Sequence, residues 1–132
     1  MKYPVFSICI PNYNYADYIG MTIESVLKQT YQNFEIIISD NCSTDNSIKI
    51  IESFNDDRIK LIKNKYNIGF APNLQKATMR AKGDFINLLS SDDLMHSRAL
   101  EVYLDAINSS KQDDKNILIF SNVRHLDKND NI

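Results

Sequence analysis

The stretch "FEIIIS" at Phe34–Ser39 decides the fold of this chain. It is a nearly continuous run of β-branched and aromatic residues, without alternation of apolar and polar positions. Such a run is typical of a parallel strand that is covered on both faces, whereas a strand with one face in water alternates. The stretch therefore predicts a buried strand in an α/β domain.

Outward from this strand, β-type runs and helical patterns alternate along the chain. Because strands that alternate with helices form parallel sheets, we expect a mostly parallel, Rossmann-like sheet with helices on both faces, in a three-layer α/β/α arrangement. The other predicted strands are Val5–Ile10, closed by Pro11, Arg58–Lys63, Asp84–Ser90 and Asn116–Val123. The predicted helices cover about 17–30, 43–54 (with Ser43 or Thr44 as N-cap), 72–83 (with Gly83 as its stop) and 97–108.

Length, charge and cysteine content indicate which classes of protein fit this sequence. The 132 residues suit one domain, 1–132, and a net charge of −2 argues against nucleic-acid binding. No stretch approaches the roughly 18 apolar residues of a membrane span. Cys9 and Cys42 form neither a metal-ligand spacing nor a disulfide framework, which favours a reducing compartment. The last strand leads into a polar tail, so we expect a chain truncated on its C-terminal side.

Three polar clusters follow predicted strands, at Pro11–Asn14, Ser39–Asp45 and Ser90–Asp93. In open parallel sheets, ligands bind beyond the carboxyl ends of the strands, at the switch point in strand order. All three clusters should then lie at one edge of the sheet. We therefore expect a single ligand to contact them together.

Each cluster offers a specific chemistry. Tyr13 can stack on a flat ring. Asp40 can accept a hydrogen bond from a ring N–H, which uracil, thymine and guanine carry and which adenine and cytosine lack on that edge. Asp92 and Asp93 are hard oxygen ligands for Mg²⁺ or Mn²⁺. Because neighbouring side chains diverge, we expect one aspartate on the metal and the other on a water, ribose or sugar hydroxyl.

Simpler interpretations exist for every one of these residues. Asp40 fits a turn after a strand, Asp92 and Asp93 fit a helix cap, and Tyr13 fits ordinary packing. Taken alone, Asn67 indicates a tight turn and Asn73 an exposed helical position. The joint placement of the clusters at one edge favours the binding site.

The motifs also resemble a known family. "SICIPNYNYADYIGMTIESVLKQTYQNFEIIISDNCSTDNS", "NKYNIGFAPN" and "AKGDFINLLSSDD" are similar to the motifs of family 2 glycosyltransferases, which have the GT-A fold. The likeness extends to about Met95. It implies a nucleotide-diphosphate-sugar donor (UDP-, dTDP- or GDP-linked) bound with Mn²⁺ or Mg²⁺. The donor-site positions that it implies are Pro11, Asn12, Tyr13, Asp40, Asn67, Asn73 and Asp92, with Asp92 and Asp93 at the metal.

The resemblance further implies inverting transfer to a hydroxyl of a glycan or lipid-linked acceptor, assisted by a general base. It makes surface-polysaccharide or glycan assembly at the cytoplasmic side of a membrane the expected setting. The base is expected beyond Ile132, so no residue of this chain is assigned to it. The chain departs from the family at Asn12, where threonine or serine is usual, at Pro72, where arginine is common, and at Ser90, where aspartate is usual.

Two other functions compete with this hypothesis. A non-catalytic nucleotide-sugar-binding module would explain Ser90 and the missing second half. A phosphoacceptor receiver domain also combines parallel strands, aspartates and Mg²⁺. It needs an acidic pair after the first strand and a lysine after the last, however, where this chain has Pro11–Tyr13 and Val123–Arg124.

Overall fold

The computed structural model describes residues 5–110, 118, 119 and 121. The chain divides into two compact units, Met1–Glu101 and Val102–Ile132. In the second unit the Tyr103 hydroxyl donates to Ser121 Oγ over 3.1 Å. Most of the predicted strand Asn116–Val123 lies outside the described residues. Sheet and candidate site both belong to the first unit.

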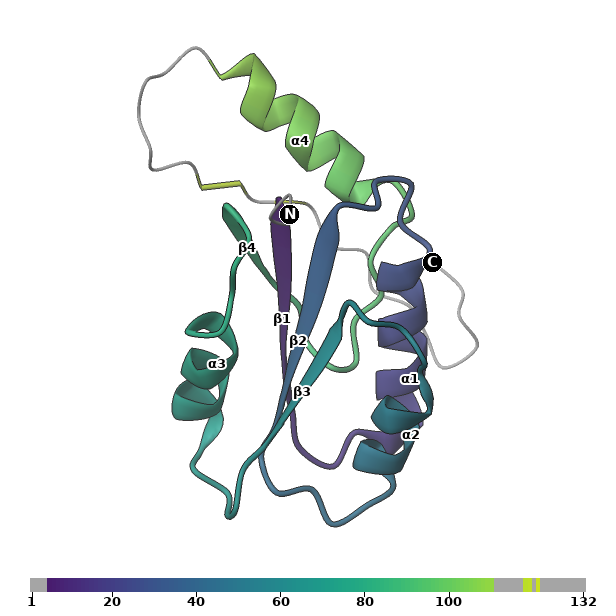
Figure 1. Ribbon diagram of the computed structural model, residues 1–132, viewed down its shortest axis with the longest axis vertical. Coiled ribbons are helices and arrows are strands. Elements are labelled where there is room, and N and C mark those ends of the chain that lie inside the picture. The colour runs from purple at the N-terminus through teal and green to yellow at the C-terminus, as the bar shows by residue number, and fades with distance from the viewer. Residues whose placement is uncertain (1–4, 111–117, 120, 122–132) are drawn as a thin grey trace. The chain divides into compact units, whose positions relative to one another are not determined.

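One parallel sheet forms the centre of the first unit, with strand order β3-β2-β1-β4 (Figure 1). All seven residues of β2 are buried, as its continuous apolar sequence predicts. In the register, Phe6 of β1 lies opposite Phe34 of β2 and Phe85 of β4. The strands are β1 (Phe6–Asn12), β2 (Phe34–Asp40), β3 (Ile59–Lys63) and β4 (Phe85–Leu88).

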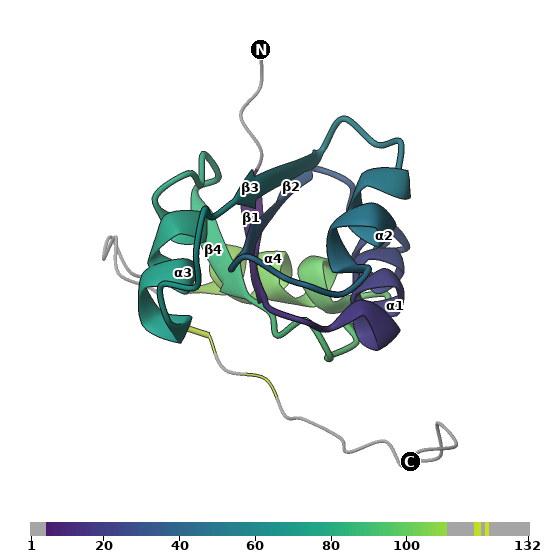
Figure 2. The ribbon, with the colours of Figure 1, turned by 90° about the horizontal axis from the view of Figure 1, so that it is seen from below.

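Helices cover both faces of this sheet, which confirms the predicted three-layer α/β fold. Helices α1 (Ala16–Leu27) and α2 (Ser47–Ser53) lie on one face, and α3 (Phe70–Thr78) lies on the other (Figures 1 and 2). Helix α4 (Ala99–Ser109) begins in the first unit and continues into the second. Among the described helices, none combines the length and the apolar character needed to cross a bilayer.

The two sheet faces have separate apolar cores, because side chains alternate along each strand. Cys9 of β1 and Ile37 of β2 pack with Ala77 of α3. Ile36 and Ile38 therefore point to the opposite face, which α1 and α2 cover. The buried residues of α1 on that side are Ile19, Thr22, Ile23 and Val26.

The strand order contains one switch point. The chain moves outward from β1 to β2 to β3 and then returns to place β4 on the other side of β1. In sheets of this type, ligands bind where such a reversal separates two neighbouring strands. The segments that follow β1 and β4 flank this point.

Several boundaries differ from the sequence prediction, among them those of β1, α2 and α3. Strand β1 runs through Pro11 to Asn12; β4 ends at Leu88, opposite Cys9, so the proline has no partner strand on that side. The N-cap of α2 is Asn46, which makes no side-chain cap bond. Helix α3 ends at Thr78, well before the predicted stop at Gly83.

Candidate functional site

A hollow of about 380 Å³ opens at the carboxyl edge of the sheet, beside the switch point. It receives residues from the ends of β1 and β2, from the β3–α3 loop and α3, and from the segment after β4. This is the convergence that the polar clusters predict. The lining residues are Pro11, Asn12, Tyr13, Tyr15, Asn41, Asn67, Gly69, Phe70, Asn73, Ser90, Ser91 and Asp92.

Most of the predicted donor-site residues line this hollow, and two predicted residues do not. Pro11, Asn12, Tyr13, Asn67, Asn73 and Asp92 contribute to its wall. Asp40 is fully buried and Asp93 is exposed, and neither belongs to the lining. The hollow therefore brings together Tyr13 and Asp92 from separate strands, with Asp40 beneath the surface.

Asp40 binds the loop that follows it. Its Oδ1 accepts hydrogen bonds from Asn12 Nδ2 over 2.8 Å and from Ser43 Oγ over 2.6 Å, and its Oδ2 accepts one from the Ser43 amide over 2.9 Å. Asn12 and Asp40 are opposite each other in the β1–β2 register. The second polar atom of the Asn12 amide, Oδ1, is buried and has no hydrogen-bond partner among the described residues.

The loops after β1 and β2 are tied together by side chains. Asn14 adopts a positive φ of 57°, and its Oδ1 accepts the Thr44 amide over 2.8 Å. Asp45 accepts the Ala16 and Ser47 amides, each over 2.9 Å. Burial raises the pKa of the Asp45 carboxyl, but these hydrogen bonds outweigh it and hold that pKa below its usual range. These hydrogen bonds join the two loops to each other.

These bonds also explain the wrong N-cap prediction for α2. The Ser43 hydroxyl is engaged with Asp40, and its oxygen also accepts the Asn14 amide over 2.9 Å. The side chain and amide of Thr44 both turn toward Asn14. Neither hydroxyl is available to cap the helix.

An asparagine cluster fixes the β3–α3 loop against the end of β2. Asn73 is 2% exposed; its Nδ2 donates to the Ser39 carbonyl and its Oδ1 accepts from Ser39 Oγ, both over 2.8 Å. Asn64 Nδ2 donates to Asn73 Oδ1, and Asn41 Nδ2 donates to Asn67 Oδ1, again over 2.8 Å. The interpretation of Asn73 as an exposed helical residue is wrong. Asn41 and Asn64 were missed, since an isolated asparagine in a loop carries no signal beyond turn chemistry.

Asp92 and Asp93 lie in a short turn after β4. The Asp93 amide donates to the Ser90 carbonyl over 3.2 Å, and both carboxylate side chains are exposed. The next helix begins only at Ala99, so neither aspartate caps a helix. The alternative interpretation as a cap is wrong, and the pair remains available to solvent or a ligand.

The residues present fit a divalent cation shared with a ligand. Within the described part of the chain, no three histidine, cysteine or acidic side chains gather as a ready metal site. Mg²⁺ is commonly held by one or two carboxylates together with substrate phosphates, and Asp92 at the hollow supplies such a carboxylate. Asp92 and Asp93 are thus suitable oxygen donors, with a phosphate-bearing ligand completing the coordination.

Aromatic side chains form an exposed rim around the hollow. Tyr13 is 42%, Tyr15 39% and Phe70 70% exposed. Large apolar rings in solvent at the mouth of a polar hollow offer faces on which a flat ligand ring can stack. The Tyr13 ring is thus partly in solvent at the mouth of the hollow and is not enclosed in the core.

Known proteins with similar sequences and folds include glycosyltransferases. The family model described as "Glycosyl transferase family 2" matches residues 7–132. The chain belongs to this family. The matched region includes the hollow and all predicted donor-site residues.

Curated glycosyltransferases show clear similarity to this chain. The Escherichia coli UDP-Glc:alpha-D-GlcNAc-diphosphoundecaprenol beta-1,3-glucosyltransferase WfgD is 43% identical over 99 residues, which cover 74% of this chain and 39% of WfgD. The Bacillus subtilis putative teichuronic acid biosynthesis glycosyltransferase TuaG is 38% identical over 104 residues, covering 77% of this chain and 41% of TuaG. The chain thus spans about two fifths of the length of these relatives.

Solved structures share the fold. TarS of S. aureus in complex with UDP superimposes with a TM-score of 0.75 at 30% identity, covering 78% of this chain and 32% of the TarS chain. A mannosyltransferase from Pyrobaculum calidifontis, in complex with GDP-Man and Mn²⁺, gives a TM-score of 0.71 at 21% identity, covering 84% and 34%. The second likeness shows the fold alone. Together they confirm the expected GT-A architecture.

Proposed function

We propose that this chain is the donor-binding part of an inverting, metal-dependent glycosyltransferase. The observation that carries the proposal is the shared hollow at the switch point, where Tyr13 and Asp92 meet from the ends of different strands. An aromatic face suits a nucleotide base, and a carboxylate suits a cation on the diphosphate.

The proposed roles combine position at the hollow with what the family resemblance implies for each residue. Pro11 and Tyr13 take the base, and Asp92 with Asp93 holds Mn²⁺ or Mg²⁺ and the ribose. The metal, when bound, offsets negative charge on the diphosphate leaving group. Asp40 reads the ring N–H: among the described residues its Oδ2 accepts only the Ser43 amide, and a carboxylate oxygen has room for a second donor. Because Asp40 is buried, this contact requires the covering loop to move on binding.

A uridine nucleotide is the donor that the relatives favour. WfgD is named as a UDP-Glc transferase, and TarS has been solved with UDP and with UDP-GlcNAc. WfgD is also named for a diphosphoundecaprenol-linked acceptor. We extend this to a lipid-linked glycan acceptor at the cytoplasmic face of a membrane, in surface-polysaccharide assembly. The general base is expected beyond Ile132.

Calorimetric titration with UDP, dTDP and GDP, each with and without Mn²⁺, tests the proposal. We expect UDP to bind with Mn²⁺, and CDP to bind more weakly because cytosine lacks the ring N–H. Tyr13→Ala should weaken UDP binding by about fivefold, the equivalent of an aromatic contact worth about 1 kcal/mol. Tyr66→Ala is the matched control, since Tyr66 is 69% exposed and does not line the hollow. No binding of any of the three nucleotides with Mn²⁺ would overturn the proposal.

One observation favours a second candidate, a non-catalytic nucleotide-sugar-binding module. Ser90 lines the hollow at a position where the family usually has an acidic residue. A missing carboxylate would weaken the hold on the ribose or metal. Turnover of UDP-sugar by the whole protein would exclude this candidate, whereas donor binding without any turnover would favour it.

A further inference from the structure

Helix α1 and the residues directly after it carry a row of polar side chains that the donor site does not explain. Thr22 and Ser25 lie three residues apart on one side of α1, and Gln29 lies two residues beyond the end of the helix at Leu27. Thr22 is fully buried and Gln29 is 1% exposed. Buried polar side chains are costly unless they are hydrogen-bonded, so their partners indicate what the row does.

Two members of the row bracket the acidic pair. Thr22 Oγ1 donates to the Ser91 carbonyl over 2.9 Å. Ser25 Oγ accepts the Met95 amide over 3.0 Å. The residues between these two anchor points include Asp92 and Asp93.

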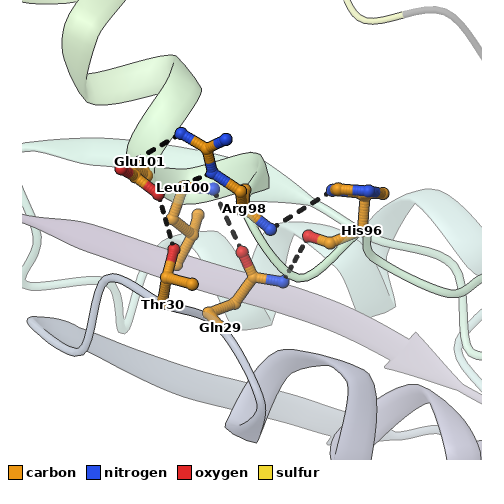
Figure 3. A network of polar contacts seen from close by, with 6 residues as sticks. All are labelled: Gln29, Thr30, His96, Arg98, Leu100 and Glu101. Carbon is orange, nitrogen blue, oxygen red and sulfur yellow. Dashed lines mark hydrogen bonds and ion pairs between the residues drawn. The ribbon is translucent and has the colours of Figure 1, made fainter.

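Gln29 fixes the next part of the same segment (Figure 3). Its Nε2 donates to the His96 carbonyl over 2.7 Å, and its Oε1 accepts the Leu100 amide over 3.1 Å. The second Nε2 proton goes to the Ser25 carbonyl over 3.2 Å. The Gln29 side chain therefore connects the end of α1, through Ser25, to the chain after β4.

Thr30 completes the contact. Its amide donates to the Ser97 carbonyl over 2.8 Å, and its hydroxyl donates to Glu101 Oε2 over 2.9 Å. Arg98 Nε donates to the same carboxylate oxygen over 3.0 Å (Figure 3). Every few residues from 91 to 101, one group of the chain after β4 is bonded to α1 or to the residues that directly follow it.

The segment needs these bonds because it has no regular structure of its own. Between the end of β4 at Leu88 and the start of α4 at Ala99 it forms only turns. An irregular segment gains no order from a helical or sheet ladder, so its conformation depends on contacts with neighbours. Here the main neighbour is α1.

We propose that Thr22, Ser25 and Gln29 are positioning residues for Asp92 and Asp93. They do not line the hollow, and they set the position of the acidic pair relative to it. The inference rests on the proposed function, because the pair is expected to hold the cation there. Groups that orient metal ligands from behind commonly change metal affinity by 10–100-fold when they are removed.

Thr22→Val tests this inference, since valine keeps the shape of the side chain and removes the donor to Ser91. We expect the Mn²⁺ concentration for half-maximal UDP binding to rise about tenfold. UDP binding without metal should stay within about twofold of the wild type. Thr22→Ser keeps the hydroxyl, so its Mn²⁺ concentration for half-maximal UDP binding should equal that of the wild type. Thr78→Val is the matched control, because Thr78 Oγ1 bonds within its own helix, to the Gln75 carbonyl over 2.9 Å, and to no other residue that the structure describes.

Amide hydrogen exchange supplies a second readout that needs no ligand. In Thr22→Val, the Asp93 and Met95 amides should exchange on the order of tenfold faster, while amides of β1 keep their rates. Unchanged exchange at both amides would overturn the inference. An equal loss of UDP binding with and without Mn²⁺ would also overturn it, since Thr22 would then support the whole hollow. If the wild type binds no nucleotide, the proposed function fails, and exchange alone decides the positioning role.

Discussion

Gly83 offers a sharp test of how the sheet is assembled. It lies between α3 and β4, where the chain passes directly over β1. A Cβ at this position would lie 2.8 Å from the Phe6 carbonyl carbon and 2.8 Å from the Ser7 nitrogen. Non-bonded carbon atoms pack at about 3.5–4.0 Å, and the atoms that Cβ would meet belong to the backbone of a central strand. They have little freedom to move away.

The expected cost of Gly83→Ala follows from two effects. Forcing an extra carbon into a packed region costs about 1–3 kcal/mol. The Gly83 amide also donates to Ser7 Oγ over 2.8 Å, and displacing it would leave buried polar groups unpaired at about 1–3 kcal/mol. The free energy of unfolding should fall by about 2–6 kcal/mol in total, which lowers the Tm by about 8–24 °C for a domain of this size.

Thermal and urea unfolding followed by circular dichroism would measure this change. Gly20→Ala is the matched control, because a Cβ there would lie 3.4 Å from Ile50 Cγ2, an ordinary contact. Alanine favours the middle of a helix over glycine by up to about 1 kcal/mol, so Gly20→Ala in α1 should be neutral or stabilising. A Gly83→Ala protein as stable as the wild type, or two variants destabilised alike, would refute the reasoning.

Two further predictions concern the ionisable side chains of Glu35 and Cys9. Burial raises the pKa of the Glu35 carboxyl, but hydrogen bonds from Ser7, the Lys82 amide and Lys60 outweigh it and hold that pKa below its usual value. A carboxylate with a lowered folded pKa contributes fully above its unfolded pKa, near 4.3, and its contribution is lost as pH falls through the folded value. Urea unfolding at stepped pH should therefore show a steeper loss of stability below about pH 5 in the wild type than in Glu35→Gln, and parallel curves would contradict this. Burial, together with the Glu35 charge, raises the pKa of the Cys9 thiol to about 12, so a thiol reagent should label Cys42 alone in the folded protein and both cysteines in urea.

The sequence predicts the architecture well because the pattern of apolar residues indicates each strand and helix clearly. The continuous apolar run of β2 is explained by its burial on both faces. The alternation of strands and helices fixes the parallel sheet, and a general rule then places the polar clusters at one edge. Prediction is weaker where side chains compete for the same hydrogen bonds. Ser43 is a natural helix cap by residue type, but the buried carboxylate of Asp40 takes its hydroxyl.

The site is predicted in location and less well in detail. Tyr13 and Asp92 face one hollow, as the polar clusters indicate. The burial of Asp40 depends on Asn12, which lies opposite it only once β1 and β2 have paired. The asparagine cluster around Asn73 depends in the same way on residues that are distant in sequence. The sequence around each of these residues does not indicate which distant residue it will bond to.

The placement of β1 has a consequence for synthesis of the chain. β1 is the earliest strand, yet it pairs on both sides, and its second partner is β4, the last strand of the described sheet. At about 5–20 residues per second, a ribosome needs a few seconds after releasing β2 to deliver β4. During that interval the edge of β1 that later pairs with β4 has no partner, so another strand can pair with it. The nascent protein is therefore most vulnerable to wrong pairing just before Phe85 emerges.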